Sequence, residues 1–436
     1  MGEALEVARE RPPGPGSVMP VLAALAMRRD PLRFLTDTAR TYGDLVHLQL
    51  GPRRDYLVNR PDWIREVLLA PEEQMLRSFP RTMTSVLGDG LLSSQGVHHR
   101  TQRRKIQPFF NHARLEGMAE VVTRHAGGLC DGWTETRAGT IDALEAMLGL
   151  TLQIILEVVF HRDLEDHAGA LMDAVGPLVG STRKKGWGLF GARRRANGFA
   201  RFEDFLSKVI ARRREDDVEG PDLVSMLLGL GSDDRTVRNE ALTMFVAGHE
   251  TIGNCLAWTW HLLSQNPEAE ARLHAEVDAL GRPPRAEDTV RLPFTGRVVS
   301  ESMRLFPPAW LMTRRPVEDF PLAGFVLPAG SYVHVSQYLM HRDPRFFPDP
   351  ERFDPDRWLP ERECTRPKFS YFPFGGGGRK CVGESFAVME GVLVLATVAQ
   401  RYRLRAIPGH RVEPEPYVTL RPRNGLPMRV ERRLRS

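Results

Sequence analysis

Hydrophobic positions recur mainly at helical spacing along this chain. That period predicts long helices over residues 113–133, 140–160, 200–214, 238–264, 267–280 and 383–402. Alternating apolar and polar positions are confined to short stretches, which predict strand pairs around Gly51-Pro52, Pro328-Ala329-Gly330 and Asn424-Gly425. The pattern therefore predicts a mainly α fold with a small β-rich region.

The ends and joins of these elements indicate the domain organisation. Residues 343–367 are rich in Pro, Asp and Arg, which predicts an ordered but irregular meander. Because no linker divides the chain, we expect a lead-in segment over residues 1–30 and one domain over residues 31–436. The apolar run at 18–27 contains a proline and is too short to span a bilayer. It also lacks the order of a secretory signal, so we expect no transmembrane segment and a cytoplasmic location.

Composition excludes several classes of protein. The chain has 436 residues and is 42% hydrophobic and 26% charged, as in ordinary soluble globular proteins. A net charge of +5 is too small to indicate a nucleic-acid partner. The four cysteines, at 130, 255, 364 and 381, form no CxxC pair. This spacing argues against a structural zinc site or a disulfide scaffold, and the usage suits a reducing compartment.

The stretch FPFGGGGRKCVGE, residues 372–384, carries the candidate chemistry. It could be a glycine loop that caps a helix beside an inert cysteine. The alternative is that Cys381 is a thiolate ligand of haem iron. Glycines let a backbone approach a macrocycle closely, and a helix that begins near Gly383 favours a thiolate at its N-terminus. Arg379 can pair with a carboxylate of such a cofactor.

Phe374, Gly377, Arg379, Cys381 and Gly383 fit the pattern F-x-x-G-x-R-x-C-x-G, in which the chain resembles the cytochrome P-450 family. The resemblance covers nearly the whole chain, from about residue 31 to 431. It implies the cytochrome P-450 fold, with haem b between a long oxygen-binding helix and the cysteine-loop helix. Cys381 would be the axial ligand of the iron, and Phe374 and Arg379 would contact the cofactor.

A second motif, FVAGHETIGN, lies inside the predicted helix 238–264. Ala247, Gly248 and Thr251 share one helical face, where small residues leave room for a ligand. A threonine inside a helix commonly just bonds the carbonyl four residues earlier. The resemblance instead implies that Glu250 and Thr251 form the family's acid–alcohol pair. Thr251 would then hydrogen-bond oxygen at the iron, and Glu250 would supply protons.

The resemblance implies three further partners of the haem propionates. In GVHHRTQRRKIQPFF, His99 stands where the family often has a tryptophan, and Arg103 follows four residues later. A His/Arg pair offers two donors to a carboxylate, although the departure leaves His98 and His99 both open. Arg314 in LMTRRPVED matches the arginine that reaches the other propionate. Arg315 would face away, because consecutive strand residues point to opposite sides.

Glu301 and Arg304 lie one helical turn apart in ESMR, with apolar neighbours that favour burial. A buried ion pair needs further partners to offset desolvation. Arg352 in DPERF would supply one. The resemblance implies that Glu301, Arg304 and Arg352 lock the meander and the cysteine loop and do no chemistry.

The resemblance implies insertion of one oxygen atom from O2 into an apolar substrate of the terpene, steroid, polyketide or fatty-acid class. Pocket residues would be Ala247, Ala309, Leu311 and Val418. Electrons would come from a separate ferredoxin-type carrier, because no GxGxxG fingerprint follows a strand here. A peroxide-driven peroxygenase and a non-catalytic haem-thiolate sensor are the alternatives. The pair Glu250-Thr251 argues against the peroxygenase, and a sensor would have no need for Thr251.

One basic segment, residues 183–195, has no place in that scheme. Its cations surround Trp187, Leu189 and Phe190. It could be a solvated loop between two helices, or it could contact an anionic partner or a membrane surface.

Overall fold

The structure is a computed structural model that describes residues 11–15, 20–51, 53–78, 87–135, 139–161, 189–215 and 220–433. Helices dominate it, as predicted. They are α1 (Pro20–Arg29), α2 (Pro31–Tyr42), α3 (Pro61–Leu69), α5 (Gly96–Ile106), α6 (His112–Glu135), α7 (Ala143–Phe160), α9 (Leu189–Glu215), α10 (Leu223–Gly229), α11 (Asp234–Gln265), α12 (Pro267–Asp278), α13 (Pro293–Leu305), α14 (Gln337–Met340), α15 (Pro360–Glu363) and α16 (Glu384–Ala399). Short 3-10 turns join some of these helices.

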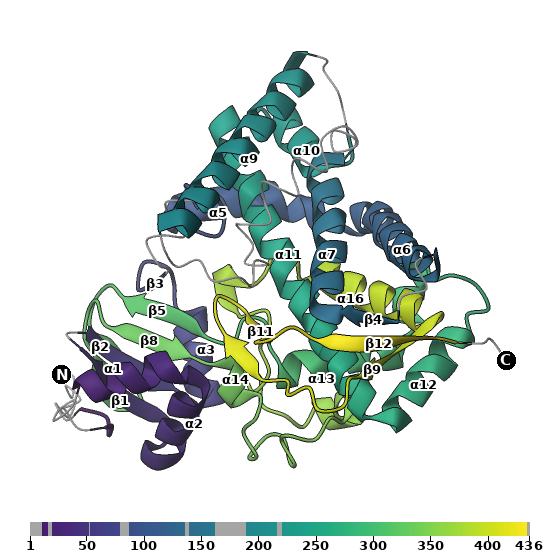
Figure 1. The fold of residues 1–436 in the computed structure, drawn as a ribbon. Helices are drawn as coiled ribbons and strands as arrows, with labels where there is room; N and C mark the ends of the chain where they lie inside the picture. The colour runs from purple at the N-terminus through teal and green to yellow at the C-terminus, as the bar shows by residue number, and fades with distance from the viewer. Residues whose placement is uncertain are drawn as a thin grey trace.

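The strands form small sheets. They are β1 (Leu45–Leu50), β2 (Arg53–Val58), β3 (Met75–Arg77), β4 (Thr140–Asp142), β5 (Met312–Pro316), β6 (Phe320–Leu322), β7 (Phe325–Leu327), β8 (Tyr332–Val335), β9 (Tyr402–Ala406), β10 (Pro414–Pro416), β11 (Leu420–Pro422) and β12 (Pro427–Arg432). The largest sheet has the order β1-β2-β8-β5-β3. Figure 1 shows it beside α1 and α2 at one side of the molecule, with the long helices on the other.

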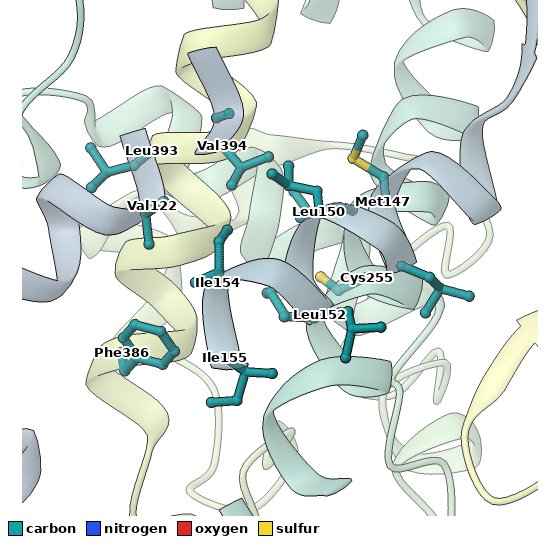
Figure 2. Packing of buried hydrophobic residues seen from close by; sticks show 14 of the residues in the cluster. Val122, Met147, Leu150, Leu152, Ile154, Ile155, Cys255, Phe386, Leu393 and Val394 are labelled. Atoms are coloured by element: carbon teal, nitrogen blue, oxygen red, sulfur yellow. The ribbon is translucent and has the colours of Figure 1, made fainter. Parts of the chain in front are cut away.

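The core of the helical part lies between α7, α11, α6 and α16 (Figure 1). Glycines let α7 and α11 approach closely: a Cβ at Gly248 would lie 2.7 Å from Ile155 Cδ1, and one at Gly253 would lie 2.8 Å from Leu148 Cδ2. Figure 2 shows apolar side chains of α7, among them Ile154 and Ile155, among neighbours from α6, α11 and α16. Gly248 therefore packs against α7, which differs from its expected place on the face that makes room for a ligand.

Helix α7 is also the one helix among the described residues that is long and apolar enough to cross a membrane. Its apolar side chains are explained by packing inside the protein, because 72% of the helix is buried there, between α6 and α11. Its first three predicted residues form strand β4 instead, since the Asp142 carboxylate accepts the Leu144 N–H at 3.0 Å and caps the helix there.

The first predicted hairpin is confirmed, and the other two strand pairings are wrong. Strands β1 and β2 pair antiparallel, with Leu50 opposite Arg53. Strand β7 pairs with β6, whereas β8 pairs antiparallel with β5 and parallel with β2. Strand β11 pairs with β10, and β12 lies between β4 and β9. Val333 of β8 and Met428 of β12 are fully buried, and a central sheet position covers such residues better than an isolated hairpin.

The meander over residues 343–367 is ordered and irregular, as predicted. Its regular structure is limited to the 3-10 turn Pro355–Trp358 and the single turn of α15. Residues 183–188 of the basic segment lie outside the described residues, and the rest of that segment begins α9.

Candidate active site

The loop before Cys381 is held by close packing. Gly375 and Gly377 adopt φ angles of +74° and +66°, a region that favours glycine. A Cβ at Gly377 would overlap the carbonyl oxygen of Leu68 at the end of α3. The glycine run is therefore required at these positions by its backbone conformation and by contact with the protein itself.

The Cys381 side chain stands at the end of this loop, just before α16. The backbone N–H of Cys381 donates to the Phe374 carbonyl at 2.9 Å, and the Phe374 ring packs at the edge of the helical core. Burial by surrounding protein raises the pKa of the Cys381 thiol, whereas a hydrogen bond from the Gly383 backbone and the charge of Arg103 lower it. The residue nevertheless keeps accessible surface. An accessible thiol inside a mostly buried setting is a position from which sulfur can ligate a docked group.

The other cysteines differ in setting. All four are free thiols. Cys130 and Cys255 are buried in the core, and burial raises the pKa of each to about 12. Cys364 lies exposed in the meander, where its Sγ contacts the Glu361 carbonyl at 3.5 Å. Cys381 is thus the cysteine whose surroundings suit metal ligation.

Buried arginines converge beside the cysteine loop. Arg314 on β5 is 5% exposed, and burial together with the charge of Arg379 lowers its pKa to about 10. Arg77 is opposite Arg314 in the β3–β5 register, and burial together with these two cations lowers its pKa to about 9. Arg315 is exposed, on the other side of the strand, as predicted. Such a cluster of buried and half-buried cations favours the binding of an anionic group.

Glu72 is the acidic member of this cluster, and sequence reasoning missed it. Its carboxylate forms an ion pair with Arg379 Nε and lies 2.9 Å from His99 Nδ1. Burial and the nearby arginines lower the pKa of His99 to about 3, so the ring is neutral. His98, in contrast, is exposed and contacts the Asp89 carbonyl. Of the two histidines, His99 is therefore the one that lies with Arg379.

Arg103 has a different partner from the one expected. Its guanidinium donates to the Lys380 carbonyl at 2.7 Å, one residue before Cys381. This bond ties α5 to the cysteine loop. A contact of Arg103 with a haem propionate stays a prediction.

The central part of α11 carries the predicted acid–alcohol pair. The Thr251 hydroxyl donates to the Ala247 carbonyl at 2.9 Å, which is the ordinary bond of a threonine inside a helix. Thr251 and Ala247 are half-buried. His249 between them is buried, and its carbonyl accepts from Thr151 of α7 at 3.0 Å. His249 is therefore a packing residue between α11 and α7.

Glu250 points toward the C-terminal strands. Burial raises the pKa of its carboxyl, and a hydrogen bond with Thr419 and the charge of Arg421 oppose that rise. Asn254, one turn along α11, donates to Thr419 Oγ1 at 3.0 Å. Arg421 in turn pairs with Glu415 at 2.9 Å. A line of polar groups therefore runs from Glu250 to half-buried residues of β10 and β11.

The buried ion pair is formed as predicted, but its third member is wrong. Glu301 and Arg304 are fully buried and joined by two bonds of 2.8 and 2.9 Å. The Arg352 side chain is exposed, and only its carbonyl contacts Arg304, at 3.0 Å. Arg357 instead places its Nε 3.3 Å from Glu301. The motif PDRW, residues 355–358, could have identified it, because it repeats the Pro-x-Arg-aromatic pattern.

The predicted pocket segments adjoin one another. The Leu420 N–H donates to the Pro308 carbonyl, and the Trp310 ring N–H donates to the Tyr417 carbonyl, each at 3.0 Å. These bonds place the turn that carries Val418 beside the connection that carries Ala309 and Leu311. Asn254 joins this turn to α11. Val418 is 55% exposed, and Ala309 and Leu311 are half-buried, so all three keep accessible surface.

Cys381, Arg314 and Arg379 together fit a haem. A metal deprotonates a coordinating thiol outright, which overcomes the raised pKa of Cys381. Buried Arg314 and Arg379, near Cys381, match two carboxylates at one edge of the macrocycle. No group of three or more His, Cys, Asp or Glu side chains suited to a bare metal ion occurs in the described part of the chain. The single thiolate is thus the ligand that this site offers.

Comparison with known proteins agrees with that fit. The family model described as cytochrome P-450 matches residues 12–426. Cyclooctatin synthase of Streptomyces melanosporofaciens is 40% identical over 427 residues, covering 93% of this chain and 92% of that protein. Pentalenene oxygenase of Streptomyces avermitilis is 31% identical over 427 residues, covering 93% of this chain and 94% of that protein.

A solved structure has the same fold. Retinoic acid bound cyanobacterial CYP120A1 superposes with a TM-score of 0.86, covering 97% of this chain and 100% of that chain. Its sequence is 23% identical, so this likeness bears on the fold alone.

Proposed function

Because the chain belongs to the cytochrome P-450 family and is a monooxygenase with a haem-thiolate cofactor, we propose that it oxidises a cyclic terpene, with electrons from a separate ferredoxin-type protein in the cytoplasm. One observation carries the choice of substrate. Two relatives at 31–40% identity, each matched over more than nine-tenths of its length, bear names that refer to cyclic terpene chemistry.

The chemistry of the pocket supports the same class. Ala247, Ala309, Leu311 and Val418 offer apolar surface, and Thr419 is a polar side chain nearby. Arg314 is buried with the cysteine-side cluster, so it is not available to clamp a substrate carboxylate. Burial of an unpaired substrate charge would be costly. Terpenes and steroids therefore rank above free fatty acids.

The haem supplies oxygen activation and the thiolate promotes O–O cleavage. The protein's own groups bind the cofactor, deliver protons and exclude water. Arg314, Arg379 and His99 would hold the cofactor carboxylates, with Glu72 orienting the last two. Thr251 would place a hydroxyl at the pocket face of α11, and Glu250 would pass protons inward from the Arg421 side. Apolar walls exclude water from the reacting substrate.

The basic surface near Cys381 supports an acidic electron donor. Arg104 is exposed on α5, and Lys380 is exposed on the cysteine loop, although Lys380 also pairs with Glu384. Lys105 contacts Ser232 at 3.5 Å, so it belongs to the side of α5 that faces the start of α11. Arg104 and Lys380 are therefore the cations that we assign to donor steering.

The test is turnover by the purified holoprotein with a panel of cyclic terpenes, steroids, fatty acids and sugars. We expect oxygenated terpene products with ferredoxin, its reductase and NADPH, and expect one atom of 18O2 in the product. Turnover with hydrogen peroxide alone would instead identify a peroxygenase. No product with either oxidant, despite ligand binding, would favour a sensor.

A further inference from the structure

Residues 87–94, which we call the wall segment, lie directly on the N-terminal half of α11. Gly88 has a φ of +58°, and a Cβ there would lie 2.6 Å from Asn239 Oδ1. A Cβ at Gly90 would overlap Thr243 Oγ1. Asn239, Thr243 and Ala247 recur every four residues and so share one face of α11. The wall segment therefore covers the same face as Ala247, one turn earlier.

Glu240 holds this segment from the α11 side. It is 1% exposed, and its Oε2 accepts the Leu91 N–H at 3.0 Å. Its Oε1 has no hydrogen-bond partner among the described residues. A buried carboxylate is costly unless it is bonded. The Leu91 amide is therefore the contact that accounts for a carboxylate at this position.

Arg379 holds the wall segment from the opposite side. Its guanidinium donates to the Ser94 carbonyl at 2.6 Å and approaches the Leu91 carbonyl at 3.5 Å. The segment is thus bound both to α11 and to the loop that carries Cys381. Arg235 and Asp89 form another link to α11, but both side chains are mostly exposed, so this pair contributes little.

We infer that Glu240 is a positioning residue, which fixes the wall segment as one side of the substrate pocket and so determines the fit of bulky ligands. The inference rests on the proposed function in that the Ala247 face must line the pocket. A polar cavity of about 170 Å³ next to Glu240 gives the segment space into which it can move when the anchor is lost. Its lining includes Asp89 of the wall segment, His98 and Gln102 of α5, and Asn239 and Glu240 of α11.

Hydrogen exchange of the holoprotein tests the anchor without turnover. In Glu240→Ala, we expect amides of residues 87–94 to exchange about tenfold faster, as the loss of one buried hydrogen bond implies. Glu240→Gln keeps an oxygen acceptor and should restore slow exchange. Arg235→Ala, which removes only the exposed link, should match the wild type. Unchanged exchange in Glu240→Ala, or equal acceleration in Arg235→Ala, would overturn the anchor role.

Two haem-iron ligands of different bulk test the pocket role. Imidazole needs only the iron, whereas 4-phenylimidazole also carries a ring into the pocket. In Glu240→Ala, we expect the dissociation constant of 4-phenylimidazole, read from the haem absorption, to change at least fivefold while that of imidazole stays within twofold. Equal effects on both ligands would overturn the pocket role. Failure of terpenes as substrates would refute the proposed substrate class and leave both measurements interpretable.

Discussion

The Arg103 guanidinium donates to the Lys380 carbonyl at 2.7 Å, so α5 is bonded to the residue before Cys381. This bond connects the thiolate loop with the exposed cations of α5. Exposed cations, Arg104 and Lys380, therefore lie on elements that this bond joins next to Cys381.

Reversal of an exposed positive charge on the basic face near Cys381 should slow reduction of the haem protein by its electron donor. We expect Arg104→Glu to lower the rate of reduction by an acidic ferredoxin about three- to tenfold at low salt, because it reverses one exposed charge. The difference should shrink as ionic strength rises. Stopped-flow reduction measures it. Lys208→Glu, which reverses an exposed cation on α9, is the matched control, and an equal loss in both variants would refute the assignment of the face.

Thr251 should serve proton delivery beyond its bond to Ala247. In Thr251→Ala, we expect substrate binding to persist while product per electron falls about tenfold and peroxide rises, because positioned proton transfer contributes factors of about 10²–10⁴. Thr259→Ala removes the same type of i−4 bond two turns later on α11 and should keep coupling normal. Equal coupling in the wild type and Thr251→Ala would mean that the hydroxyl only bonds its own helix.

The stability of the protein should depend on Arg357, which contacts Glu301, and much less on Arg352. Glu301 is fully buried, so Arg357→Ala should lower the free energy of unfolding by about 1–3 kcal/mol through loss of a charged partner. Arg352→Ala should stay within about 0.5 kcal/mol, because its side chain is exposed. Urea unfolding of the two variants compares them directly. A larger loss in Arg352→Ala than in Arg357→Ala would contradict the geometry.

Glu240 should make stability depend on pH. Burial raises its pKa to about 7 in the folded protein, against an ordinary value near 4.5, while the Leu91 N–H and the charge of Lys105 from α5 oppose the rise. Asp89, His98, Asp233 and Arg235 also line the adjacent cavity. The folded state thus binds more protons between about pH 4.5 and 7, and stability falls as pH rises through that window.

Glu240→Gln removes this contribution. From pH 5 to pH 8 we expect the wild type to lose about 2–3 kcal/mol of unfolding free energy relative to Glu240→Gln. Glu250 and Glu390, whose pKa values are also raised, are present in both proteins and cancel in the difference. Urea unfolding at several pH values measures it. A pH-independent difference would show that Glu240 does not titrate in this range.

Local patterns predicted the parts of this molecule that local forces determine. The periodicity of 238–264 identified α11, and the adjacent strands β1 and β2 were paired correctly. The pairing of β2 with β8 joins Asp55 to Tyr332, and no local signal specifies a partner so distant in sequence. Sheet order was missed for that reason.

In the candidate site, too, residues in local motifs could be predicted, whereas residues that matter through distant contacts could not. Cys381 and Glu250 lie in motifs with fixed spacing, so their elements could be placed in advance. Glu72 lies in an ordinary turn, and its importance arises only where His99 and Arg379 meet it in space. Arg352 and Arg357 lie in similar short motifs five residues apart, and burial of the second one is what distinguishes them.

The absorption spectrum of the reduced, carbon-monoxide-bound protein tests the central claim most directly. We predict the strongly red-shifted Soret band of thiolate ligation in the wild type and in Cys364→Ala, whose sulfur is exposed in the meander. Cys381→Ser should lose that band while keeping the fold, as judged by circular dichroism. A normal red-shifted band in Cys381→Ser would contradict the assignment of Cys381 as the iron ligand.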